Sequence, residues 1–231
     1  MSSGNRSVIP GLVSHMSCSL PITGVTLPLL ESPPAGAHPH AWIDVEVEVR
    51  VDAAARVTAL HMVWLFDDIY SAYVTQGLSF TGSDALDPER TARILAVMMK
   101  NLARFHYMTA VEAGSGPVEF APPVEAAVVL RGRRLELEFT LPLAEPVPVR
   151  PGPVTYSVYD PSYYIEMLHA EKADAVRLRG APAGCRPELT PPHPDPERVR
   201  EAAALDRNQS GSEGLGAFFA ERVEIVCDTG R

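Results

Sequence analysis

Two histidines separated by one proline offer the clearest metal-binding chemistry in this sequence. His38-Pro39-His40 directly precedes a stretch in which polar and apolar residues alternate. Alternate residues of an extended chain share a face, so both imidazoles could bind one divalent transition metal: zinc, nickel, cobalt or copper. Two ligands are too few, because tetrahedral zinc takes three or four. The other interpretation is a pair of solvated histidines near the start of a domain.

Aspartates at the ends of expected strands are the candidates for the missing ligands. Asp67 and Asp68 follow an apolar run, and Asp160 follows another. We expect Asp67 and Asp160 to be the main carboxylate ligands, with Asp44 and Asp68 as further candidates. The competing interpretations are a helix N-cap for the Asp67-Asp68 pair and ordinary turn chemistry for Asp160 before a proline.

The segment before the histidines resembles an export signal. Residues 1–37 contain one cation, Arg6, then a mixed apolar region broken by prolines, and end in Ala35-Gly36-Ala37. This order predicts a signal peptide, or otherwise a disordered leader. Cleavage after Ala37 would add the free amine of His38 as a donor. Residues 38–231 are then expected to form a single β-rich periplasmic domain.

The cysteines fit an exported chain. Cys18 lies in the leader, so that two remain, Cys185 in a turn-like context and Cys227 at the end of an apolar run. An even pair in an exported chain predicts one disulfide. Two independent buried thiols are the alternative.

Charge and missing motifs exclude several classes of function. A net charge of −9 with a pI near 5.3 argues against nucleic acid as a partner, because phosphates would be repelled. No run approaches the roughly 20 apolar residues that span a bilayer, so we expect no membrane insertion of the mature chain. Nucleophile-elbow, zinc-protease, P-loop and dinucleotide motifs are absent from the sequence, which favours a protein that is not an enzyme.

The residues above must be positioned by helices and strands, and the pattern of apolar and polar residues predicts which ones. It favours a β-rich α+β fold with mainly antiparallel strands and two or three helices. Residues 40–49 alternate with a period of two, 51–55 form a turn and 56–66 return as a central strand. Two helices are expected at 87–105 and at 195–205, and each begins with an Asp-Pro pair. Further strands are expected at 107–113, 118–120, 124–130, 135–141, 154–159, 176–178, around Leu189 and at 223–226. We expect His61 to be a core histidine, and His106, His169 and His193 to lie on the surface.

Three blocks of this sequence resemble a known bacterial family. They are His38-Pro39-His40-Ala41-Trp42-Ile43-Asp44, the stretch WLFDDIYS at 64–71 and the stretch YDPSYY at 159–164. The family is a domain of unknown function, often described as the periplasmic component of an uncharacterised ABC-type transport system. Its members are commonly encoded beside nickel/cobalt-type exporters. The resemblance implies export and metal handling, and it supports His38, His40, Asp44, Asp67 and Asp160 as site residues.

The sequence as a whole predicts a soluble periplasmic protein that binds a divalent transition metal and serves as accessory to a membrane metal transporter. The alternative is a β-rich adaptor that binds no metal and docks on a membrane transporter subunit. A third option is a periplasmic hydrolase or oxidase with an N-terminal copper site.

Overall fold

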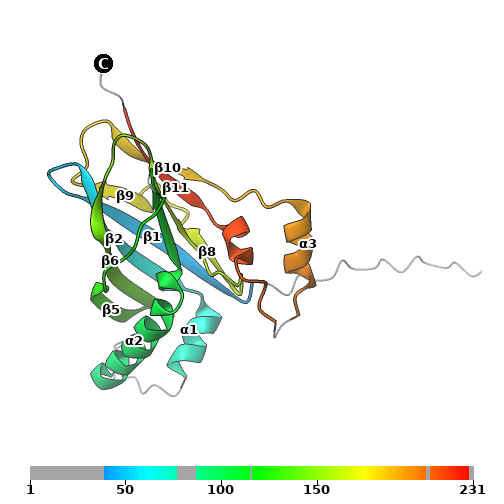
Figure 1. Ribbon diagram of the computed structural model, residues 1–231. Helices are drawn as coiled ribbons and strands as arrows, with labels where there is room; N and C mark the ends of the chain where they lie inside the picture. Colours follow the sequence, from blue (N-terminus) through cyan, green and yellow to red (C-terminus); the bar gives the residue numbers. More distant parts are fainter. Residues whose placement is uncertain (1–38, 77–86, 115, 207–208, 229–231) are drawn as a thin grey trace, which may run out of the picture. The chain divides into compact units, whose positions relative to one another are not determined.

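The computed structural model describes residues 39–76, 87–114, 116–206 and 209–228, and it confirms a β-rich α+β fold. Two sheets, three α-helices and two 3-10 turns make up this part of the chain (Figure 1). The expected leader and His38 lie outside the described residues.

The first sheet is built around an antiparallel hairpin. Strand β1 (Ala41–Val51) buries every second residue, as the alternating sequence predicts, and β2 (Arg56–Phe66) pairs with it. Asp52 closes the turn between them, because its carboxylate accepts hydrogen bonds from the backbone N–H groups of Ala54 and Arg56. The hairpin fixes which face of β1 carries its polar side chains.

Four more strands complete this sheet. A tight turn at Gly132 joins β5 (Val124–Arg131) to β6 (Arg134–Pro148), and β6 pairs with β2. On the other side, β8 (Ile165–His169) and β9 (Val176–Arg179) both run parallel to β1. The sequence did not predict β8. The pairing is mainly antiparallel, as expected, and the parallel contacts of β1 with β8 and β9 are the exception.

The second sheet has the strand order β10-β11-β7-β3-β4. Its strands are β10 (Cys185–Thr190), β11 (Arg222–Cys227), β7 (Val154–Val158), β3 (Thr109–Ala113) and β4 (Gly116–Pro117). Cys185 and Cys227 stand opposite each other on β10 and β11 and form a disulfide, as predicted. The expected strand at 118–120 is wrong: only an isolated bridge joins Phe120 to Leu143.

Both sheets contribute to one apolar core. Trp64, Phe139 and Val47 from the first sheet belong to the same buried cluster as Tyr156 and Ile225 from the second. Trp64 and Phe139 meet edge to face, with ring centroids 5.1 Å apart. The apolar face of the first sheet is therefore the inner face, and its polar face is turned away from this core.

The helices begin where the sequence predicts. Asp67, Asp87 and Asp195 cap α1 (Asp68–Thr75), α2 (Pro88–Ala103) and α3 (Pro196–Ala204), each accepting two backbone N–H groups. The 3-10 turns are η1 (His106–Met108) and η2 (Leu215–Phe219). No helix within the described part of the chain has the length and apolarity to cross a membrane.

Candidate functional site

Asp67 serves as a structural cap at the end of β2. One carboxylate oxygen, Oδ1, accepts hydrogen bonds from the backbone N–H groups of Ile69 (2.7 Å) and Tyr70 (2.8 Å). The other, Oδ2, accepts from the backbone N–H of Trp42 at 2.8 Å. Asp67 therefore begins α1 and also ties this helix to the start of β1, as the N-cap interpretation predicts.

Asp160 organises the loop that follows β7. It is buried, with 6% of its surface exposed. Its Oδ1 accepts from the backbone N–H of Ser162 at 2.9 Å, and its Oδ2 accepts from the backbone N–H groups of Tyr164 and Ile165 at 3.0 Å each. Gly216 packs directly on this loop, and a Cβ at that position would overlap the Asp160 carbonyl. The carboxylate thus holds the loop in one conformation.

His40 lies at the entrance to β1, beside the Asp160 loop. Its backbone N–H donates to the Tyr164 carbonyl at 2.9 Å, and the two rings contact with centroids 4.8 Å apart. Because Asp67 binds Trp42 and Asp160 binds Tyr164, three of the sequence candidates gather around the start of β1. His40 is half-buried.

The remaining aspartates lie outside this arrangement. Asp44 accepts from the Arg134 guanidinium at 2.7 Å, on the polar face of β1. Asp68 is exposed in the first turn of α1. Within the described residues, no three His, Cys, Asp or Glu side chains are grouped as a metal would require. A metal site that includes His40 therefore needs ligands from outside this set, such as His38.

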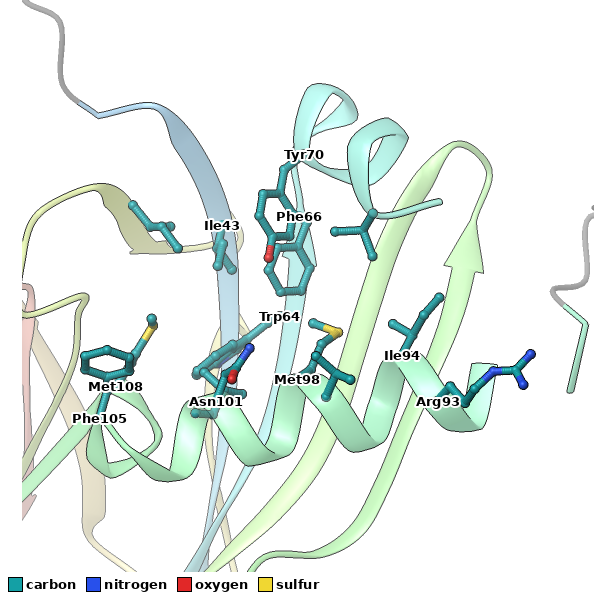
Figure 2. A pocket seen from close by; sticks show the side chains of 14 residues that line it. Ile43, Trp64, Phe66, Tyr70, Arg93, Ile94, Met98, Asn101, Phe105 and Met108 are labelled. Atoms are coloured by element: carbon teal, nitrogen blue, oxygen red, sulfur yellow. The ribbon is translucent and has the colours of Figure 1, made fainter. Parts of the chain in front are cut away.

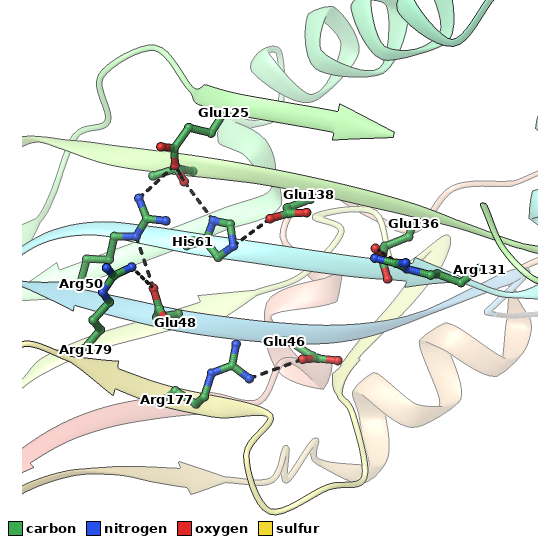
Figure 3. Close-up of polar contacts among 11 residues, drawn as sticks. Glu46, Glu48, Arg50, His61, Glu125, Arg131, Glu136, Glu138, Arg177 and Arg179 are labelled. Carbon is green, nitrogen blue, oxygen red and sulfur yellow. Dashed lines mark hydrogen bonds and ion pairs between the residues drawn. The ribbon is translucent and has the colours of Figure 1, made fainter. Parts of the chain in front are cut away.

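The polar face of the first sheet carries a network of paired charges (Figure 3). His61 was expected in the core, but it lies on this polar face instead, with its ring nitrogens 3.2 Å from Glu138 and 3.0 Å from Thr140. Arg50 pairs with Glu125 at 3.0 Å. Bonds to Thr140 and Arg50 lower the pKa of Glu125 below its usual value. Side chains paired in salt bridges between strands therefore cover much of this face.

His169 was expected on the surface, and the structure corrects this. The residue is buried, because β8 pairs with β1 and carries it between the sheets. Its Nδ1–H donates to the Glu221 carboxylate at 2.7 Å, and its Nε2 lies 3.0 Å from the Tyr156 hydroxyl. Burial raises the pKa of Tyr156 well above its usual value. These three side chains form a buried hydrogen-bonded chain between β7, β8 and the start of β11.

An apolar cavity of about 390 Å³ lies between the first sheet and the two helices α1 and α2 (Figure 2). Its walls come from β1, β2, α1, α2, η1 and β8. The lining residues are Ile43, Trp64, Phe66, Tyr70, Val74, Arg93, Ile94, Val97, Met98, Asn101, Leu102, Phe105, Met108 and Ile165. The helix residues were expected to pack in the core. Instead, several of them border this cavity, so it is a site that sequence reasoning missed.

One residue of the cavity lining has a buried polar atom that lacks a hydrogen-bond partner in the described part of the chain. Trp64 is fully buried, and no group in the described part of the chain accepts a hydrogen bond from its indole Nε1–H. The η1 residues His106, Tyr107 and Met108 all have positive φ angles. Such angles are unfavourable for residues with a Cβ and cluster at functional sites. They turn the chain so that Met108 reaches the cavity wall.

Comparison with known proteins identifies a family without a known activity. Residues 24–227 match the family model described as "Protein of unknown function (DUF1007)". The chain is also 27% identical over 195 residues to an uncharacterized protein of Haemophilus influenzae (strain ATCC 51907 / DSM 11121 / KW20 / Rd), covering 83% of this chain and 92% of that protein. The family match covers most of the chain, from the segment before the histidine motif to the disulfide. The protein therefore belongs to the DUF1007 family.

Proposed function

We propose that the protein is an exported, periplasmic binder of a divalent transition metal (zinc, nickel, cobalt or copper) that acts as accessory to a membrane metal transporter. The observation that carries the proposal is the position of His40. Its backbone and ring are held against Tyr164 at the entrance to β1, two residues after His38. A fixed imidazole loses little conformational entropy when it binds a metal.

The disulfide supports the exported part of this proposal. Cys185 and Cys227 are bonded across β10 and β11. Disulfides of this kind persist in oxidising compartments such as the bacterial periplasm and are rare in the cytosol. The resemblance to a family encoded beside nickel/cobalt-type exporters supports the link to a transporter.

Three of the four predicted carboxylates already have partners within the fold. Both carboxylate oxygens of Asp67 and both of Asp160 already accept hydrogen bonds from backbone N–H groups. These bonds hold the local fold. Asp44 is paired with Arg134. The metal is therefore assigned to His38 and His40, with the N-terminal amine of a cleaved chain as a further donor. Asp68 is the carboxylate of the predicted set that is exposed and does not cap a helix.

Calorimetric titration with Zn²⁺, Ni²⁺, Co²⁺ and Cu²⁺ tests the proposal. We expect saturable binding of at least one ion by the exported, processed protein, and loss of this binding in the His38→Ala/His40→Ala double variant. His106→Ala/His193→Ala is the matched control, since both residues are exposed and lie outside the motif. Equal affinity in the wild type and the His38/His40 variant would overturn the assignment.

A second candidate is the metal-independent adaptor, and exposed apolar side chains on α1 favour it. Ile69 and Tyr73 lie one helical turn apart and are 76% and 75% exposed. Large apolar side chains this exposed are typical of contact surfaces. Binding of the purified protein to its transporter subunit should then weaken in the Ile69→Ser/Tyr73→Ser variant and be insensitive to a metal chelator. Binding that requires a metal and has the same affinity in the wild type and the Ile69→Ser/Tyr73→Ser variant would refute this candidate.

A further inference from the structure

We propose that two copies of the protein associate through β5, which pairs antiparallel with the β5 strand of the partner copy, so that the first sheets of both copies form one continuous sheet. Three observations support this pairing: the unpaired edge of the strand, its apolar sequence, and the acidic and basic side chains near its two ends. The pairing is independent of the proposed metal function.

Strand β5 is the last strand on its side of the first sheet, so only one of its edges is paired. A two-residue turn joins Arg131 to Arg134, and the residues on either side of such a turn form a hydrogen-bonded pair. Hydrogen-bonded and non-hydrogen-bonded pairs alternate from there, so that Ala126, Val128 and Leu130 direct their backbone N–H and C=O groups away from β6. In the described part of the chain, no other segment forms backbone hydrogen bonds with these three residues.

The other outer strands of the two sheets are short or contain proline, whereas β5 is long and contains none. β8 and β9 have five and four residues, and β4 and β10 contain Pro117 and Pro187. β5 spans eight residues without proline or lysine. Short strands, proline and lysine are common features that prevent edge-to-edge pairing. Val129 of β5 is also 39% exposed, and a second strand beside it would cover part of this apolar surface.

The charges near the two ends of β5 favour a second copy as the partner. Antiparallel pairing with Val128 opposite the partner's Val128 brings Ala126 opposite the partner's Leu130, so that the unpaired backbone groups of both strands meet. The same register places Glu125 beside the partner's Arg131, and the two-fold axis repeats this pair at the other end. Opposite charges on neighbouring strands attract each other. The irregularity of β5 precedes residue 127 and therefore lies at the end of this pairing.

Both charged side chains keep free hydrogen-bonding atoms on the outer face of the sheet (Figure 3). Glu125 uses Oε2 for its bonds to Arg50 and Thr140. Arg131 binds Glu136 through Nε at 3.0 Å. Within the described residues, Oε1 of Glu125 and the terminal nitrogens of Arg131 have no hydrogen-bond partner, and the two side chains are 59% and 65% exposed. An ion pair with the partner copy would thus extend the network without breaking an existing bond.

Sedimentation equilibrium of the purified full-length protein, at about 5–500 µM, tests the association, since a short strand pairing gives a small interface and a weak dimer. We expect a reversible monomer–dimer equilibrium. Glu125→Arg and Arg131→Glu should each raise the dimer dissociation constant about tenfold, because each change places like charges together at both ends of the paired strands. Glu145→Arg and Arg200→Glu are the matched controls, since both residues are exposed and lie outside β5.

A mixture of the two variants separates pairing between copies from effects within one copy. The Glu125→Arg variant carries a cation at both ends of β5, and the Arg131→Glu variant carries an anion at both. An equal mixture should therefore form heterodimers with nearly the wild-type affinity, which damage within a single chain would not allow. A mixture that associates as weakly as its components would overturn the inference.

The wild type alone also decides the outcome, even if a variant fails to fold. A wild type that stays monomeric over the whole concentration range would leave this edge to a strand of another protein and would refute self-pairing. A dimer that neither single variant weakens would place the contact on another surface and would refute it as well.

Discussion

The start of β1 and the cavity between α2 and the first sheet differ in how their polar atoms are used. Around β1, the oxygens of Asp67 and Asp160 accept hydrogen bonds from the backbone of neighbouring elements. In the cavity, the Trp64 indole has no acceptor within the described residues. Polar groups that are already satisfied contribute to stability, whereas a buried unsatisfied group lowers it.

The two regions should therefore respond in opposite ways to substitution. Changes at the strand ends should lower the free energy of unfolding, whereas removing the unsatisfied Trp64 N–H should change it little. The four predictions below test this difference, from the largest expected effect to the smallest.

Asp160→Ala should be the most destabilising change. It leaves the backbone N–H groups of Ser162, Tyr164 and Ile165 without their charged acceptor in a buried loop. We expect a loss of about 3 kcal/mol in the free energy of unfolding, measured by urea denaturation. Asp174→Ala, at an exposed aspartate, should cost little. If Asp160→Ala left stability unchanged and removed metal binding instead, the carboxylate would be a ligand and the contrast between the regions would fail.

Asp67→Ala should cost about 1–2 kcal/mol, because it removes the N-cap of α1 and the acceptor for Trp42. The neighbouring Asp68 is the control, since it is exposed and does not cap the helix. Thermal unfolding of Asp67→Ala and Asp68→Ala under identical conditions gives the comparison. Equal midpoints for the two variants would contradict the capping role.

The His169–Glu221 pair should give a pH-dependent contribution. Burial raises the pKa of Glu221, but the hydrogen bonds from His169 outweigh this and lower it below the usual 4.5. A lowered pKa in the folded state means that the contribution is complete above the unfolded-state value and is lost as the pH falls through the folded-state value. The stability difference between wild type and Glu221→Gln should thus be constant above about pH 5 and shrink below pH 4.5. A constant difference at all pH values would disprove it.

Trp64→Phe should have the smallest effect on stability, within about 1 kcal/mol. Removing an unsatisfied donor is favourable, and this offsets the packing lost with the larger ring. Tyr156→Phe is the matched comparison, since it removes a hydroxyl that is bonded to His169, and it should cost more. Denaturation of both variants without added ligand measures the difference. A larger loss for Trp64→Phe than for Tyr156→Phe would contradict this prediction.

The sequence predicted local elements well where one signal dominates. The period-two alternation of residues 40–49 gave β1 and both of its faces, and Asp-Pro pairs gave the starts of α2 and α3. The Cys185–Cys227 disulfide followed from an even cysteine pair. Each of these features depends on residues close in sequence or on simple counting.

The features that the sequence did not predict depend on distant contacts. The stretch 165–169 has little strand character of its own and becomes β8 through pairing with β1, which is also what buries His169. The residues at 106–108 adopt positive φ angles that their types do not favour, so the strand expected from 107 begins at Thr109. An apolar face on α2 predicts contact with the sheet, but it does not distinguish a filled core from a cavity. For this reason the metal candidates were visible in the sequence and the cavity was not.

The parallel pairing of β1 with β8 and β9 has a consequence for the order in which the chain can fold. β1 spans residues 41–51, whereas the strands that cover one of its edges span 165–169 and 176–179. Until these residues have left the ribosome, that edge presents unpaired backbone groups on a valine-rich strand, which is a template for aggregation. A chain truncated before residue 165 should therefore aggregate even though it contains the complete β1–β2 hairpin, and a nascent chain depends on being kept apart from its neighbours until synthesis is nearly complete.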